Sequence, residues 1–272
     1  HEPGIKAAGC MLSPLHIKAN FYNFDNLYDL FDEFEVSVSG SVDLPLALHA
    51  KYRTDKRGNS TLPRIKRNLE LLVGYPHHKK ISCVVTREHL GRLDEFVADI
   101  RHIHYDIGLD MTKFNIMFSF DSCKSLEKFD GHVSGTEMLN DQEQLILYNR
   151  LHEKFVGTDL EPGLREHWFK EFTPEFCCSA VNCGDKFFLL QSNGDVYACP
   201  HGQRLPSFHY GNVFELRVTE VMANGWKTIE ALENTQAGNE KCYSCNYLPH
   251  CHQGCVFVRE ETGLTKSYTC AL

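Results

Sequence analysis

Short apolar runs alternate with amphipathic segments over the first half of the chain, up to about residue 119. Four runs predict β-strands, at residues 17–22, 34–39, 80–86 and 114–120, and three of them have the Val/Ile/Phe content typical of strands covered on both faces. Apolar residues at helical spacing predict helices between them, at residues 26–34, 60–73 and 93–103. Alternating strands and helices imply right-handed βαβ units with parallel strands, so the first half is predicted to be α/β.

The pattern changes twice further along the chain. Residues 125–176 contain few strand signals and one amphipathic helix, predicted at residues 140–155. After residue 176, short strands and turns prevail, and Asn193-Gly194 between two apolar runs predicts a β-hairpin. We therefore predict an α/β domain over residues 1–124, a helical connector over 125–176 and a small α+β domain over 177–272.

Composition and charge restrict the classes of partner. The 272-residue chain has 28 basic and 36 acidic side chains, a formal charge of −8, so we expect no nucleic-acid partner, because binding phosphates requires clustered Lys and Arg. No apolar run approaches the roughly 20 residues that cross a bilayer, and the first residues do not resemble a signal peptide. We expect a cytoplasmic protein that does not bind membranes.

The cysteines are concentrated in the last third of the chain. Nine of the twelve lie after residue 176 at close and uneven spacings, which is typical of metal or cluster ligands. Cys242-x2-Cys245 places two thiolates on one tight turn, and this pair alone fits zinc and iron–sulfur equally well. Cys83, by contrast, lies in an apolar run and is predicted to be a buried core thiol.

The complete cysteine pattern resembles the SPASM domain of radical S-adenosylmethionine (radical SAM) peptide-modifying enzymes. Cys183 is followed by ten residues, Gly194, four residues and Cys199, then by Cys242-x2-Cys245-x5-Cys251-x3-Cys255 and a last Cys270. Gly211-Asn212-Val213 also resembles a Gly-Asn-Ile/Val segment of that domain.

The resemblance implies two auxiliary [4Fe–4S] clusters in this domain. The first would be held by Cys177, Cys183, Cys199 and Cys255, with Cys178 as the alternative to Cys177. The second would be held by Cys242, Cys245, Cys251 and Cys270. Two structural zinc sites on the same eight thiolates are the alternative interpretation.

The α/β half resembles part of the radical SAM barrel. Residues 34–41 resemble its fourth strand, and residues 49–53 resemble the His-Asp-x-x-Arg helix that follows, with Ser41 and Ala50 departing from the pattern. The resemblance implies an N-terminally incomplete (β/α)6 barrel, TIM-like and with about four of its six strands, in a longer polypeptide. The Cys-x3-Cys-x2-Cys segment that binds the radical SAM cluster does not occur in the chain, and we expect it upstream.

The same resemblance implies contacts to S-adenosylmethionine (AdoMet). Ser37 and Ser39 face one side of their strand, either into the barrel mouth or as strand-end caps. Residues 1–4 resemble the tail of a Gly-Gly-Glu-Pro motif, with His1 departing from it, which makes Glu2 a candidate ligand. Arg53 completes the expected AdoMet-binding set.

The implied function is a radical SAM maturase that abstracts hydrogen from a ribosomally made peptide and installs a crosslink or related modification. The partners would be a precursor peptide and a reductant such as flavodoxin or ferredoxin. Sulfatase maturases have Asp after the cysteine equivalent to Cys199, whereas this chain has Pro200 and His201, which disfavours formylglycine formation. His201 is a candidate base. The alternative is a non-catalytic iron–sulfur or zinc protein that binds a peptide.

Overall fold

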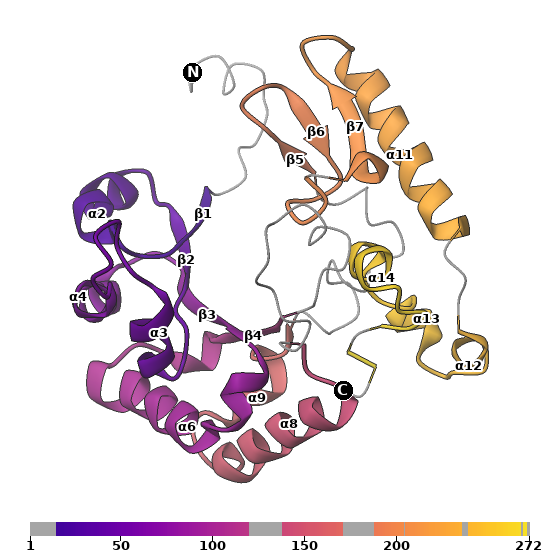
Figure 1. Ribbon diagram of the computed structural model, residues 1–272. Helices are drawn as coiled ribbons and strands as arrows, with labels where there is room; N and C mark the ends of the chain where they lie inside the picture. Colours follow the sequence, from indigo (N-terminus) through magenta and orange to yellow (C-terminus); the bar gives the residue numbers. More distant parts are fainter. Residues whose placement is uncertain are drawn as a thin grey trace. The chain divides into compact units, whose positions relative to one another are not determined.

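The computed structural model describes residues 15–119, 138–170, 188–203, 205–235, 239–267 and 269–270. The chain forms two compact units (Figure 1). We call them the sheet unit, with described residues 15–118 and Leu147–Phe169, and the cysteine unit, with the described residues of Ser119–Ile146 and Lys170–Leu272.

The sheet unit is built on four parallel strands in the order β1-β2-β3-β4, at His16–Ala19, Ser37–Ser41, Lys79–Val85 and Asn115–Phe118. Their connections contain α2 (Phe24–Glu33), α3 (Leu46–Tyr52), α4 (Leu62–Gly74), α5 (Arg87–Leu90), α6 (Leu93–Arg101), the π-helix η1 (His102–Ile107) and the 3₁₀-helix η2 (Met111–Lys113). The α/β fold with a parallel sheet is thus confirmed.

The strand predicted at residues 34–39 begins later than expected, at Ser37. Phe34 caps the C-terminus of α2, Glu35 adopts a left-handed backbone with φ of 51°, and the Val36 N–H donates to the Phe31 carbonyl at 2.8 Å. These are the features of a helix that ends in a left-handed turn. Residues 34–36 therefore complete the helix end before the strand starts.

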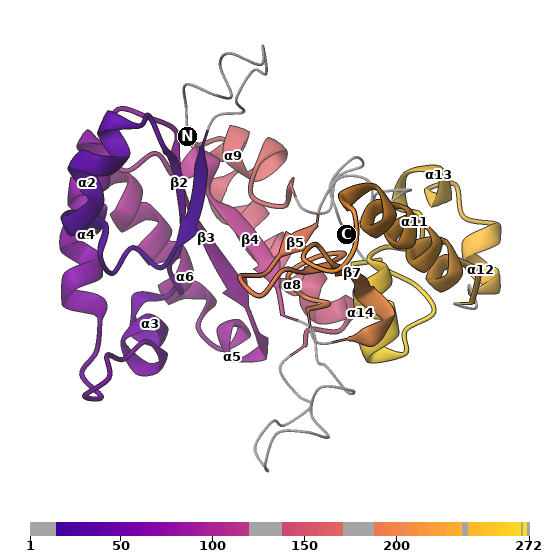
Figure 2. The same ribbon diagram turned by 90° about the horizontal axis from the view of Figure 1, so that it is seen from above.

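The two faces of the parallel sheet differ in chemistry. Paired residues point to the same face, so Val38, Ile81, Val85 and Ile116 lie on one side, each no more than 1% exposed. Helices α2, α4 and α6 lie on this apolar face (Figures 1 and 2). The opposite side, which we call the polar face, carries His16, Lys18, Ser37, Ser39, Ser41, Lys80, Ser82 and Asn115.

A later segment returns to the sheet unit and completes its core. The α8 helix (Asp141–Phe155) leads to α9 (Glu161–Glu166), and Trp168 then donates its indole N–H to the Met111 carbonyl at 2.8 Å. The Ile116 N–H donates to the Trp168 carbonyl at 2.7 Å. Trp168 is fully buried, and its ring packs edge-on against Phe155, so this segment is anchored beside β4.

The cysteine unit contains a small antiparallel sheet in the order β5-β6-β7, at Leu189–Leu190, Asp195–Tyr197 and His209–Asn212. The predicted hairpin is confirmed between β5 and β6, where Gly194 adopts a φ of 89°. The helical elements are η5 (Pro206–Phe208), α11 (Val218–Thr235), α12 (Glu240–Tyr243), α13 (Leu248–Cys251) and α14 (Val256–Thr262). Helix α11 packs on β7 through Gly225, where a Cβ would lie 2.5 Å from the Tyr210 ring.

None of the helices in the described ranges is long and apolar enough to cross a membrane.

Candidate functional site

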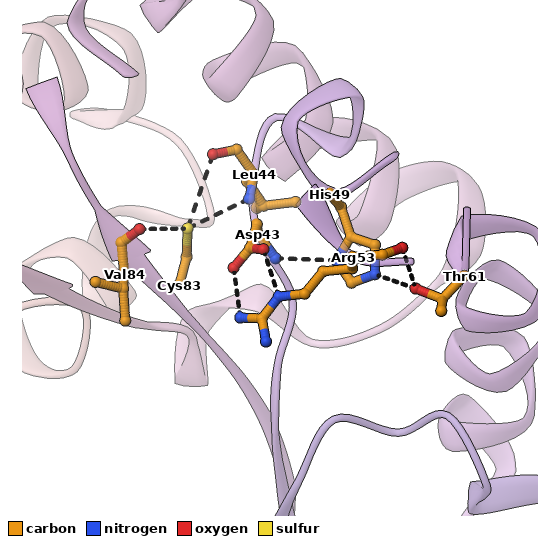
Figure 3. Close-up of polar contacts among 7 residues, drawn as sticks. All are labelled: Asp43, Leu44, His49, Arg53, Thr61, Cys83 and Val84. Carbon is orange, nitrogen blue, oxygen red and sulfur yellow. Dashed lines mark hydrogen bonds and ion pairs between the residues drawn. The ribbon is translucent and has the colours of Figure 1, made fainter. Parts of the chain in front are cut away.

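A polar network joins the loop after β2 to helix α3 and the start of α4 (Figure 3). Arg53 donates from Nε to Asp43 Oδ2 at 2.7 Å and from Nη2 to Asp43 Oδ1 at 3.0 Å, a two-pronged contact typical of Arg with a carboxylate. Arg53 was predicted as an AdoMet ligand, and two of its nitrogens are thus occupied by Asp43.

The buried side chain of His49 forms a hydrogen bond to the same loop. Its Nδ1 accepts the Asp43 N–H at 3.2 Å, so the neutral ring carries its proton on Nε2, which lies 3.2 Å from Thr61 Oγ1. The Thr61 hydroxyl donates in turn to the Arg53 carbonyl at 2.9 Å. Burial lowers the pKa of His49, which favours this neutral form.

Cys83 lies beside this network but within the apolar core. The side chain is fully buried, and its Sγ accepts the Leu44 N–H at 3.3 Å (Figure 3). Burial raises the pKa of its thiol to about 12. The prediction of a buried core thiol is confirmed, and an un-ionised thiol is a poor metal ligand.

The two predicted serine ligands lie on the polar face of the sheet. Ser39 is 3% exposed, and its Oγ lies 3.0 Å from His16 Nε2. The pKa of His16 is lowered by burial and then by the charges of Lys80 and Lys18. Basic groups therefore surround Ser39 on this face, a feature that sequence reasoning missed because it depends on the register between strands.

The remaining AdoMet candidates are placed differently. Arg53 follows α3 in the network with Asp43, and no hydrogen bond joins it to Ser37 or Ser39 among the described contacts. Glu2 lies outside the described residues.

In the cysteine unit, hydrogen bonds fold residues 239–255 into consecutive tight turns. Asn239 caps α12, and its carbonyl accepts the Cys242 N–H at 2.8 Å. The Cys242 carbonyl then accepts the Cys245 N–H at 3.0 Å, so these two cysteines share one turn as their spacing predicts. Cys251 ends α13, and Cys255 is the N-cap residue of α14.

The segment carrying Cys270 is held against these turns at two points. The Asn239 N–H donates to the Thr265 carbonyl at 3.0 Å. Gly254, with φ of 78°, lies so close to Ser267 that a Cβ would be 2.4 Å from its hydroxyl oxygen. Because the Cys270 N–H also donates to the Ser267 carbonyl, Cys270 is placed at the same end of the unit as Cys251.

The thiols of this end influence one another electrostatically. The pKa of Cys270 is raised first by burial, and Cys251 and Cys242 raise it further, while Lys266 lowers it. None of Cys242, Cys245, Cys251 and Cys270 forms a disulfide. Across the described ranges, no three His, Cys, Asp or Glu side chains are gathered closely enough to hold a metal ion. The four thiols suit an iron–sulfur cluster by ligand type, because such clusters take thiolates, but the structure does not gather three of them closely.

Of the other predicted ligands and the candidate base, the structure describes some residues and not others. Cys177 and its alternative Cys178 lie outside the described residues, as does Cys183. Cys199 follows β6 and is partly exposed. His201 is an exposed turn residue whose ring packs edge-on against Phe257, with 5.5 Å between centroids.

Comparison with known proteins identifies similar chains. No family model matches the chain. A cysteine-type anaerobic sulfatase-maturating enzyme of Clostridium novyi is 24% identical over 238 residues, covering 83% of this chain and 59% of the relative. A serine-type enzyme of Bacteroides thetaiotaomicron is 22% identical over 253 residues, covering 85% and 58%. The chain is thus similar over most of its length to anaerobic sulfatase-maturating enzymes.

Solved structures agree on the fold. The sulfatase-maturating enzyme anSMEcpe with bound AdoMet superposes with a TM-score of 0.71 and 19% identity, covering 94% of this chain and 66% of that one. SuiB of Streptococcus suis, bound to its precursor peptide SuiA, gives a TM-score of 0.51 and 13% identity, covering 93% and 63%. The predicted relationship to radical SAM/SPASM maturases is confirmed. The chain spans about three fifths of the length of the curated relatives that it matches.

Proposed function

We propose that the chain is the larger part of a radical SAM enzyme that modifies a ribosomally made peptide. The observation that carries the proposal is that one chain combines a parallel sheet with a polar face and a C-terminal group of thiols, over a length that superposes on AdoMet-bound structures. Two similar solved structures hold bound peptides, Kp18Cys on anSMEcpe and SuiA on SuiB. The substrate proposed here is accordingly a peptide.

The polar face is the proposed lining of a partial (β/α)6 barrel. Ser37 and Ser39 would hold polar groups of AdoMet, with Glu2 as a further ligand. The two hydrogen bonds between Arg53 and Asp43 hold the loop after β2 in place. They use Nε and Nη2 of Arg53, so Nη1 would be the nitrogen that contacts a ligand. Arg53 would thus bind AdoMet from a position set by Asp43.

Two auxiliary clusters are proposed for the cysteine unit, on the ligand sets Cys177, Cys183, Cys199, Cys255 and Cys242, Cys245, Cys251, Cys270. When bound, AdoMet and the clusters supply radical and electron-transfer chemistry, with electrons from a reductant such as flavodoxin or ferredoxin. The chain's own contribution to the second set is structural, because its turns and the Gly254–Ser267 contact bring the thiols to one end of the unit.

The product is proposed to be a crosslink. Pro200 and His201 stand where sulfatase maturases have Asp, so the residue after Cys199 does not supply a carboxylate base. His201, exposed on its turn, is the base we propose instead. Formylglycine formation is the second candidate, because the relatives named above mature sulfatases.

The test uses the full-length protein from the natural gene, reconstituted with iron and sulfide without oxygen. We expect dithionite-dependent formation of 5′-deoxyadenosine from AdoMet, detected by chromatography and mass spectrometry. Co-expression with peptides encoded by neighbouring genes then separates the candidates. A crosslink removes two hydrogen atoms, whereas formylglycine introduces an aldehyde that reacts with a hydrazide probe.

A fully clustered sample that forms no 5′-deoxyadenosine would contradict the enzymatic proposal and favour a non-catalytic peptide-binding protein. Stoichiometric zinc in protein prepared without oxygen would contradict the clusters themselves.

A further inference from the structure

Two lysines flank Ser39 on the polar face of the parallel sheet. The register pairs Lys18 of β1 with Ser39 of β2, and Ser39 with Lys80 of β3, so the three residues form one row across three strands. Neighbouring strands lie about 4.8 Å apart, which puts the two lysine Cα atoms about 10 Å apart. Both side chains point to the same face and can therefore reach one small group above Ser39.

A contact of Lys18 shows that this face is concave. Its Nζ lies 3.8 Å from the Sδ of Met117, which belongs to β4 at the other edge of the sheet. In a flat sheet β1 and β4 would be about 14 Å apart, and side chains standing upright on it would not meet across that distance. The sheet therefore curves, and the ammonium group of Lys18 extends over its polar face.

The strands supply positive charge to this face and no negative charge. Strands β1 to β4 contain no Asp or Glu. The described hydrogen-bond partner of the Lys18 ammonium group is the Met117 thioether, a weak acceptor. Lys79 differs, because it points to the opposite face and its ammonium group donates to the Val73 and Tyr75 carbonyls. An anion on the polar face would thus be stabilised by the charge there.

The effect on a neighbouring side chain agrees with this charge. The ring of His16 lies 3.0 Å from Ser39 Oγ, and its pKa is lowered by burial and then by the charges of Lys80 and Lys18. Both lysines thus act on the space next to Ser39, as the register requires.

The charge of AdoMet indicates which ligand would bring the anion. AdoMet carries a sulfonium, an ammonium and one carboxylate group, so its net charge is positive. Arg53 is already proposed as a ligand of AdoMet, and it supplies a cation for that carboxylate. Two further lysines beside AdoMet would repel it unless a second ligand brings negative charge. The second ligand proposed for this protein is a peptide, whose anionic side chains are carboxylates.

We propose that Lys18 and Lys80 bind a carboxylate of the peptide substrate above Ser39, so that the protein selects peptides with an acidic residue near the one that it modifies. The two lysines determine which peptide is held and how it is oriented. This inference rests on the proposed function, because it requires that AdoMet and a peptide occupy the polar face together.

The experiment measures binding rather than turnover. Full-length, anaerobically reconstituted protein with saturating AdoMet selects from a synthetic library of random peptides, and the bound peptides are sequenced by mass spectrometry. The wild-type pool should be enriched in Asp and Glu. One selected peptide and its Glu→Gln form should differ about tenfold in Kd, since a hydrogen bond to a charged group contributes about that much. Lys18→Gln and Lys80→Gln should remove both the enrichment and the difference in Kd.

Two further variants separate charge from folding. Lys66→Gln is the matched control, an equal loss of charge at an exposed position of α4, and it should keep the wild-type preference. Lys18→Arg keeps the charge and should also keep the preference. Circular dichroism compares the fold of each variant with that of the wild type.

Calorimetry with AdoMet and with its decarboxylated analogue identifies the source of the carboxylate. Support requires that Lys18→Gln and Lys80→Gln lose the acidic preference and keep the wild-type affinity for AdoMet; any other combination overturns the proposal. Weaker binding of AdoMet, with no loss for the decarboxylated analogue, would show that the lysines hold AdoMet instead. Wild-type protein that does not bind AdoMet would contradict the proposed function as well, whereas AdoMet binding without an acidic preference would contradict this inference alone.

Discussion

The sheet unit and the cysteine-bearing turns of residues 239–255 are stabilised in different ways. In the sheet unit, α4 alone buries Ile65, Leu69 and Leu72, each no more than 1% exposed. Helices α12 and α13 are four residues each and bury none. Segments that bury so little apolar surface need other support, and a metal or cluster supplies it in many small domains. We therefore predict that the sheet unit is stable through its own packing, whereas the turns of residues 239–255 require a metal or cluster bound to their thiols.

The largest expected effect is loss of the second cluster from Cys251→Ala. This change removes one of the four proposed ligands, so we expect roughly four irons fewer per chain, since a [4Fe–4S] cluster is held by four thiolates. Residues 239–270 should lose protection against hydrogen exchange, while the sheet unit keeps its own. Iron and sulfide analysis with hydrogen-exchange mass spectrometry measures both.

The control for this comparison is Cys83→Ala, which removes a thiol buried in the sheet unit. It should leave the iron content unchanged. Full iron loading in Cys251→Ala would show that the ligand assignment is wrong, and loss of protection in the sheet unit would show that the two regions are not independent.

Sequence patterns predicted the four strands and helices α2, α4, α6 and α8, but not the contacts that join them into a unit. The helix predicted at residues 93–103 ends as an α-helix at Arg101 and continues as a π-helix that stops at Gly108, with φ of 89°. The spacing of apolar residues in the sequence gives no sign of this π-helix. The return of Trp168 to Met111 was also unpredictable, because it depends on tertiary contacts between distant segments.

The candidate sites show the same limit. Cysteine spacing predicted the shared turn of Cys242 and Cys245, which is a local feature of the backbone. It could not predict that Lys266 pairs with Asp141, or that Lys80 lies near His16, because both depend on contacts between distant segments. The local turn could therefore be predicted from the sequence, whereas the charged neighbours of these side chains could not.

The two tryptophans of the chain allow a second test, one in each unit. Trp168 is fully buried and donates a hydrogen bond to the Met111 carbonyl, so Trp168→Ala should destabilise the sheet unit by about 3–5 kcal/mol. Trp226 on α11 is 64% exposed, so Trp226→Ala should change stability by no more than about 0.5 kcal/mol. Urea unfolding followed by circular dichroism compares them, and similar losses in the two variants would contradict the assigned core.

The smallest predicted effect is a loss of stability of the sheet unit in acid, caused by the charge of one buried histidine. Burial lowers the pKa of His49 below its ordinary value of 6.5, so the unfolded chain binds a proton more readily than the folded one. The stability that His49 contributes is complete above pH 6.5 and is lost as the pH falls below it. The loss is at most about 1.4 kcal/mol for each pH unit.

His49→Gln keeps an acceptor for the Asp43 N–H but cannot be protonated. Measured by urea unfolding of iron-free protein, its stability should fall less between pH 7 and pH 5 than that of the wild type. Iron-free samples exclude acid release of clusters, so the remaining slope belongs to the polypeptide. An unchanged slope would mean that the His49 ring already takes up a proton in the folded protein. The link from Asp43 through His49 to Thr61 would then not hold the neutral tautomer that its hydrogen bonds require.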